Sequence, residues 1–181
     1  MPDHESVHPI SAGRVGIWMF LAAEMMFFIG LAGSYIVLRS ASPMMFESQS
    51  MKLKRSVEVG ETVVLLGSSV TMMLAVSAAR LGKNRRVVGM IALTVLLGFG
   101  FLFVGSLQPI GDMRQNRFWA SYALLTGAHW AHLAGGLVAL MLLGVQASRG
   151  RMFAATTEYV GMYWHFVVGV WVVLFGFLYL M

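Results

Sequence analysis

Long apolar stretches alternate with short polar ones along the whole chain. Each apolar stretch is long enough to cross a bilayer as one helix, since a spanning helix needs about 20 mostly apolar residues. The pattern therefore predicts an all-α fold, a polytopic membrane protein built as a bundle of five transmembrane helices. The predicted helices cover about 15–38, 58–81, 87–107, 122–146 and 159–181.

The polar stretches between these helices are short. We expect residues 1–14 to form an N-terminal tail and residues 15–181 to form one transmembrane domain. The segment 39–57 is predicted to be a loop, and so is the polar region 108–121. Loops of this length leave no room for a catalytic domain, so any chemistry has to come from side chains inside the bundle.

The composition agrees with a membrane protein and excludes several kinds of site. The chain has 181 residues, of which 58% are hydrophobic and 12% are charged, whereas a soluble domain carries about 25% charged residues. It has no cysteine, which excludes disulfides, thiolate metal sites and cysteine nucleophiles. The net charge of +5 lies mostly in loops, where Lys and Arg set membrane orientation, so it does not indicate nucleic-acid binding.

The orientation in the membrane follows from where the basic residues lie. Five spans place the two termini on opposite sides. Seven Lys and Arg fall on the side of the N-terminus and six on the other, so the count alone decides little. The dense basic turn at residues 82–86 favours a cytoplasmic N-terminus and a periplasmic C-terminus.

A single ionisable residue, Glu24, lies in the middle of the first apolar stretch. An ionised side chain at that depth costs about 2.5–3.5 kcal/mol on insertion scales. Glu24 therefore has to face protein or water, or remain protonated. Helical spacing places it on one face with Phe20, Phe28 and Tyr35, and we expect this face to point into the bundle.

The last two apolar stretches carry further polar residues. His129 and His132 lie three residues apart, and His132 and Glu24 are each ~15 Å deep, measured from opposite surfaces. If their helices pack together, Glu24 and His132 are able to pair. Glu158 is expected at the headgroup boundary, and His165 follows on the same helix face.

Three interpretations of these five polar residues are open. Buried polar side chains of membrane bundles commonly hydrogen-bond across helices, at about 0.6 kcal/mol each on average, and this interpretation is favoured. The second interpretation is a route for protons. The third is a metal or haem site, since Glu and His are plausible metal ligands.

The fourth apolar stretch also carries small residues at every fourth position. Small residues at this spacing let a neighbouring helix approach closely, and van der Waals contact drives helix association in lipid. The pattern predicts a helix-packing seam, and it is also compatible with a dimer interface. The seam residues are Ala123, Gly127, Ala131, Gly135 and Ala139.

Four stretches, in order, resemble the helices of subunit III of haem-copper oxidases, the cytochrome c and quinol oxidases. The run Gly16–Arg39 resembles the first conserved helix, and Val64–Thr71 looks like the Leu-x-Ser-Ser-x-Thr helix. Leu125–Gly136 resembles the Thr-Gly-x-His-x-x-His segment, and Glu158–Leu180 resembles the last helix. The chain looks like the short five-helix form, which lacks the first two helices of the seven-helix form.

The resemblance implies a non-catalytic subunit of a proton-pumping terminal oxidase, which reduces oxygen to water in the bacterial cytoplasmic membrane. It implies that the chain binds no metal or other cofactor except structural phospholipid, and that partner subunits hold the haems and copper. The implied partners are the catalytic subunit I, subunit II and membrane lipids, with small subunits or a respiratory supercomplex as further partners. The resemblance also implies that Glu24 corresponds to the family's carbodiimide-reactive carboxyl and that the subunit supports proton uptake.

Two other functions remain open at this point. The nearer is an accessory subunit of a nitric oxide reductase, whose first helix tends to carry Gly-Asp where this chain has Ala23-Glu24. The more distant is a membrane metalloenzyme that uses His129, His132, His165 and the two glutamates. The chain also departs from the oxidase pattern at Glu61, where the family usually has asparagine.

Overall fold

The computed structural model describes residues 12–51, 53, 55–107, 116–151 and 154–180. Across these residues the chain is helical and has no strand, and five of its helices are long and apolar enough to cross a membrane. The protein is therefore an integral membrane protein with the predicted all-α fold. The predicted tail, residues 1–14, lies outside the described residues except for its last three, which belong to the first helix.

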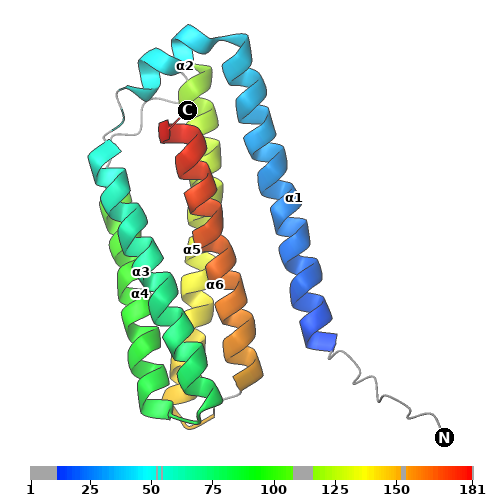
Figure 1. Cartoon of the computed structure of the whole chain (residues 1–181), viewed down its shortest axis with the longest axis vertical. Helices are drawn as coiled ribbons and strands as arrows, with labels where there is room; N and C mark the ends of the chain where they lie inside the picture. The colour runs from blue at the N-terminus through cyan, green and yellow to red at the C-terminus, as the bar shows by residue number, and fades with distance from the viewer. Residues whose placement is uncertain (1–11, 52, 54, 108–115, 152–153, 181) are drawn as a thin grey trace, which may run out of the picture.

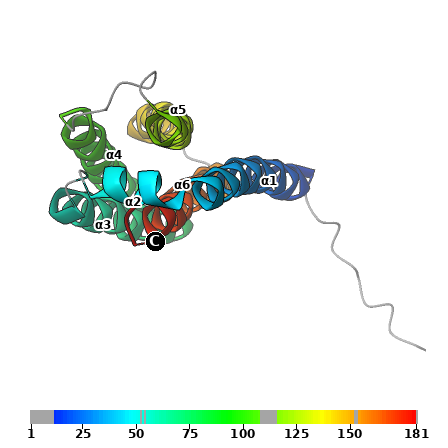
Figure 2. The same cartoon turned by 90° about the horizontal axis from the view of Figure 1, so that it is seen from above.

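The five long helices run alternately up and down, so α1 begins at one end of the bundle and η1 ends at the other (Figure 1). In the described part of the chain the elements are α1 (Ala12–Ala41), α2 (Pro43–Ser50), α3 (Arg55–Arg80), α4 (Asn84–Ser106), α5 (Arg117–Ser148), α6 (Ala154–Phe175) and the π-helical turn η1 (Gly176–Leu180). Helix α3 packs against α4 and α6, and α5 packs against α4 and α6. Helix α1 packs mainly against two of the long helices, α5 and α6. It lies at the edge of the bundle when viewed from above (Figure 2).

Buried side chains form two groups. The larger group lies among α3, α4, α5 and α6 and includes Leu133 and Trp164, both fully buried. The second group joins α1, α2, α5, α6 and η1 and is mostly aromatic. In it the ring of Phe46 makes edge-to-face contacts with Tyr35 and Phe118, a geometry that aromatic pairs prefer.

Two glycines make room for the indole of Trp164. A Cβ atom on Gly98 would lie 2.9 Å from this ring, and one on Gly136 would lie 3.0 Å from it. The indole Nε1–H donates to Oγ of Ser68 at 3.1 Å. Helices α3, α4 and α5 therefore all meet α6 at one side chain, and small residues permit the close approach.

The segment 39–57, predicted to be a loop, contains the helix α2. Pro43 lies in its first turn, where a missing N–H is tolerated because that group has no intrahelical partner. Phe46 is buried, and the Nε1–H of Trp119 donates to Oε1 of Gln49 at 3.2 Å. The loop prediction was wrong because contacts with other helices, and not an apolar run, stabilise this short helix.

The long helices also begin earlier than the apolar stretches do. Helix α5 starts at Arg117 and not near residue 122, because the side chain of Asn116 caps it by accepting the N–H of Trp119 at 3.1 Å. Helix α6 starts at Ala154 and not near residue 159. Polar residues at these starts, Asn116 and Arg117 for α5 and Thr156 and Thr157 for α6, lower the local hydropathy, so hydropathy alone places these boundaries too late.

Candidate functional site

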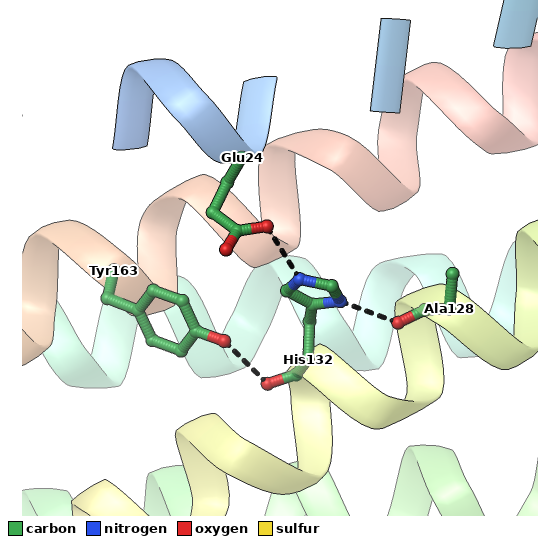
Figure 3. A network of polar contacts seen from close by, with 4 residues as sticks. All are labelled: Glu24, Ala128, His132 and Tyr163. Atoms are coloured by element: carbon green, nitrogen blue, oxygen red, sulfur yellow. Dashed lines mark hydrogen bonds and ion pairs between the residues drawn. The ribbon is translucent and has the colours of Figure 1, made fainter. Parts of the chain in front are cut away.

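Helices α1 and α5 bring Glu24 and His132 into direct contact (Figure 3). Oε2 of Glu24 lies 2.8 Å from Nε2 of His132. The contact confirms the pairing predicted from the matching depths of the two residues. The side chains of Glu24 and His132 are 22% and 19% exposed, so protein shelters the pair on most sides but does not seal it.

The second ring nitrogen of His132 fixes where its hydrogen lies. Nδ1 is 2.7 Å from the carbonyl oxygen of Ala128, and because a carbonyl only accepts, Nδ1 carries a hydrogen. Nε2 and the carboxyl of Glu24 then share one further proton. Either the protonated acid donates to a neutral imidazole, or an imidazolium donates to the carboxylate. Both arrangements have no net charge, which limits the cost of placing the pair in an apolar surrounding.

Aromatic rings surround this pair. Phe28 packs edge-on against the imidazole of His132, with ring centroids 4.9 Å apart. Tyr163 of α6 donates its hydroxyl hydrogen to the carbonyl oxygen of His132 at 3.0 Å (Figure 3). The ring of Phe20 lies 5.8 Å from that of Tyr163. Phe28 and Tyr35 are buried, so this part of the predicted face of α1 points into the bundle, whereas Phe20 is 45% exposed.

The Ser-Ser-x-Thr stretch of α3 joins this helix to two others. Oγ of Ser69 lies 2.7 Å from Nδ1 of His165 on α6. Oγ of Ser68 accepts a hydrogen bond from the indole N–H of Trp164 on α6. The hydroxyls of Thr71 on α3 and Thr94 on α4 lie 2.7 Å apart. Each hydroxyl of the motif therefore bonds to another helix, a role that the sequence did not reveal.

The other predicted polar residues lie apart from the Glu24–His132 pair. Glu158 accepts a hydrogen bond from Nε of Arg80 at 2.7 Å, where α3 ends and α6 begins. His129 is fully buried beside the rings of Phe101 and Trp171. Neither ring nitrogen of His129 has a hydrogen-bond partner in the described part of the chain.

The five predicted residues therefore do not converge on one centre. Only Glu24 and His132 meet, while His129, Glu158 and His165 have separate surroundings. Among the residues that the structure describes, no three His, Cys, Asp or Glu lie close enough together to hold a metal ion. The interpretation as hydrogen bonding between helices is confirmed for Glu24–His132, for Glu158 with Arg80, and for His165 with Ser69.

A second group of buried polar residues was not predicted. Glu58 and Glu61 are each only 4% exposed near the start of α3. Tyr179 of η1 hydrogen-bonds to the carboxyl of Glu58, and its hydroxyl lies 2.8 Å from that of Tyr122. Within the described ranges, one carboxyl oxygen of each glutamate has no hydrogen-bond partner. The one signal in the sequence was the unusual glutamate at position 61.

The predicted helix-packing seam is not a seam within the described part of this chain. Gly127, Ala131 and Gly135 are exposed, and Ala123 and Ala139 are only partly buried. The core-facing residues of α5, among them Leu125, His129 and Leu133, lie on the other side of the helix. Larger apolar side chains fill the core, so the small residues face outward. A contact with another chain remains a prediction.

An apolar groove of about 670 Å³ lies between α1 and α6. Every residue that lines it is apolar, and its walls include Phe28 and Ala32 of α1 and Gly169 and Val173 of α6. In a helix bundle that spans a membrane, such a groove offers a surface for hydrocarbon chains.

Comparison with known proteins identifies relatives along most of the chain. No protein-family model matches it. Cytochrome c oxidase subunit 3 of Bacillus sp. (strain PS3) is 30% identical over 176 residues, which cover 92% of this chain and 84% of that protein. The chain belongs to the subunit III family of haem-copper oxidases. This finding confirms the resemblance seen in its four helix motifs.

Other members of the subunit III family show the same coverage of this chain. Quinol oxidase subunit 3 of Bacillus subtilis (strain 168) is 28% identical over 182 residues, 92% of this chain and 86% of that protein. Cytochrome c oxidase subunit 3 of Synechocystis sp. is 30% identical over 175 residues, 92% of this chain and 74% of that protein. The names of these relatives include both cytochrome c and quinol oxidases.

Proposed function

We propose that this chain is the non-catalytic subunit III of a proton-pumping terminal oxidase, in which partner subunits hold the haems and copper and reduce oxygen to water. The observation that carries the proposal is the contact between Glu24 and His132. It joins two of the four helix motifs by which the chain resembles the family, and relatives named as oxidase subunits align with 92% of the chain. Those names also favour an oxidase over a nitric oxide reductase.

The chain acts as a scaffold beside the catalytic subunit I, with subunit II as a further partner. The outward-facing small residues of α5 support this role, because they allow a helix of another subunit to approach closely. Small subunits and a respiratory supercomplex are partners of the assembled oxidase. The chain lies in the bacterial cytoplasmic membrane with its N-terminus in the cytoplasm, as the basic turn between α3 and α4 favours.

Phospholipid is the ligand that this chain itself holds. The groove between α1 and α6 is apolar along its whole lining. It lies between two helices that are long enough to cross the hydrocarbon core. Acyl chains in this groove would fill space beside the Glu24–His132 pair and hold α1 against the rest of the bundle.

The Glu24–His132 pair supports proton uptake by the oxidase. It holds one shared proton while remaining neutral, and it is partly open to its surroundings. A group of this kind accepts a proton from one side and releases one to the other without leaving a buried net charge. The pair therefore serves as a relay that keeps the catalytic subunit supplied during turnover.

Replacing Glu24 with glutamine in the assembled oxidase tests this role. The amide side chain would keep a hydrogen bond to His132 but would have no acidic proton to transfer. We expect Glu24→Gln to leave haem content intact and to make oxygen-reducing activity decay faster during sustained turnover. The matched control is Glu47→Gln, which makes the same chemical change on the exposed surface of α2. A turnover lifetime equal to that of the wild type would refute a functional Glu24.

A further inference from the structure

A second pocket lies at the turn between α3 and α4, away from the Glu24–His132 pair. Its volume is about 300 Å³. Leu74, Leu81 and Met90 form apolar parts of its wall, and Lys83 and Arg86 supply positive charge. The pocket therefore combines a hydrocarbon-compatible surface with two cations.

At the turn between α3 and α4 all charged side chains are positive. Residues 80–86 contain four basic side chains and no acidic one. Arg80 is paired with Glu158, but Lys83 and Arg86 form no ion pair with any residue that the structure describes. Both side chains are exposed, so they are available to an anion from outside the chain.

The cations and the apolar wall lie in the order that a phospholipid requires. Helix α3 ends at Arg80 and α4 begins at Asn84, so Lys83 lies where the chain leaves the hydrocarbon core. Leu74 lies six residues before the end of α3, or ~9 Å further into the membrane. It is 51% exposed, and Leu81 is 67% exposed. An acyl chain could cover both leucines while its phosphate stayed at the level of Lys83.

We propose that the pocket at the α3–α4 turn binds an anionic phospholipid, with the phosphate held by Lys83 and Arg86 and an acyl chain against Leu74, Leu81 and Met90. Basic pockets between membrane helices recognise anionic headgroups through such cations. A free phosphate would not use the apolar wall, and a zwitterionic lipid would bring its own positive charge. This proposal extends the lipid binding of the proposed function by naming the headgroup that the chain prefers. It depends on the membrane-spanning fold and not on the oxidase role.

Lipid binding to the purified full-length chain in detergent tests this site by native mass spectrometry. The probes are phosphatidylglycerol and phosphatidylcholine with identical acyl chains. The test variant is the double substitution Lys83→Gln and Arg86→Gln. Its control is Arg149→Gln with Arg151→Gln, which removes the same charge from the neighbouring turn before α6. Circular dichroism before the assay establishes that each variant is folded.

We expect the wild type to retain phosphatidylglycerol in preference to phosphatidylcholine. Removal of both pocket cations should weaken phosphatidylglycerol binding about 25-fold, at about fivefold for each cation. The control pair should bind as the wild type does, and Lys83→Arg with Arg86→Lys should retain the preference. Ser77→Phe, which fills the pocket without changing charge, should also weaken binding.

Two results would contradict the proposal of an anionic-lipid site at the α3–α4 turn. Equal weakening by the pocket and control pairs would show that charge at this end of the bundle acts diffusely. Displacement of the lipid by an equal concentration of inorganic phosphate would show a plain anion site without a lipid component. Either result would leave the oxidase role untouched, because that role is tested at Glu24 and by haem content.

Discussion

An acid in the middle of a membrane span is stabilised at Glu24 by one correctly held imidazole. The carbonyl of Ala128 fixes the orientation of His132, so that Nε2 faces the carboxyl group. The pair stays neutral whichever atom holds the shared proton. Removing one member leaves the other polar group partly buried without its partner, which costs about 1–3 kcal/mol.

The substitution His132→Leu should therefore lower the thermal unfolding midpoint of the purified chain. Combining it with Glu24→Leu should restore most of the loss, since replacing a buried polar pair by apolar residues of similar size is often neutral or stabilising. Midpoints of the two single variants and the double variant, measured in one detergent, form a double-mutant cycle. Strictly additive losses would show that the two side chains are not coupled.

At the level of single residues, sequence reasoning was most accurate for Glu24 and His132. Their matching depths allowed the two side chains to pair if their helices pack together, and the packing of α1 against α5 meets that condition. The burial of Glu58 and Glu61 could not be predicted in the same way. It depends on Tyr179 of η1 and on neighbouring side chains that cover the start of α3, and these contacts are set by the tertiary structure.

Helix packing in this bundle depends on where glycine permits close approach. Gly98 of α4 faces the core, and a Cβ atom there would lie 2.8 Å from Leu137 and 2.9 Å from Trp164. Gly100, two residues further along the same helix, has no such neighbour within 4 Å. The two glycines therefore share a helix but have opposite packing constraints.

Alanine substitution at these two positions should have opposite effects. We expect Gly98→Ala to lower stability by about 1–3 kcal/mol, because it overpacks the core around Trp164. Gly100→Ala should be neutral or stabilise the helix by up to about 1 kcal/mol, the difference in helix propensity between the two residues. Thermal or denaturant unfolding of the purified chain measures both. Equal effects at the two positions would contradict the packing seen around the indole.

Prediction at the level of helices succeeded for the spans and failed for their ends and outer faces. Hydropathy identifies the five spans because each must satisfy the same bilayer thickness. It does not detect α2, which is held by Phe46, nor the capped start of α5 at Asn116. The spacing of small residues on α5 was visible, but spacing alone does not say whether the partner belongs to the same chain.

At the scale of the whole molecule, α1 is the least covered of the long helices. In the most apolar 18-residue stretch of α1 only 11% of the residues are buried, against 28–33% in the corresponding stretches of the other four spans. Its buried stripe includes Phe28, Ala32 and Tyr35, and side chains such as Met19 and Met26 are largely exposed. Lipid or another subunit is therefore expected to cover the outer side of α1.

The central claim is that this chain is a companion of a redox enzyme and does not itself hold the redox centres. The most direct test is to purify the tagged chain from the membranes of its own organism and to record reduced-minus-oxidised spectra before and after separating it from its partners. We expect the intact preparation to contain haem and to reduce oxygen, and the separated chain to contain neither haem nor copper in stoichiometric amount. Haem or copper bound by the histidines of the separated chain, or a preparation in which no oxidase accompanies it, would contradict the claim.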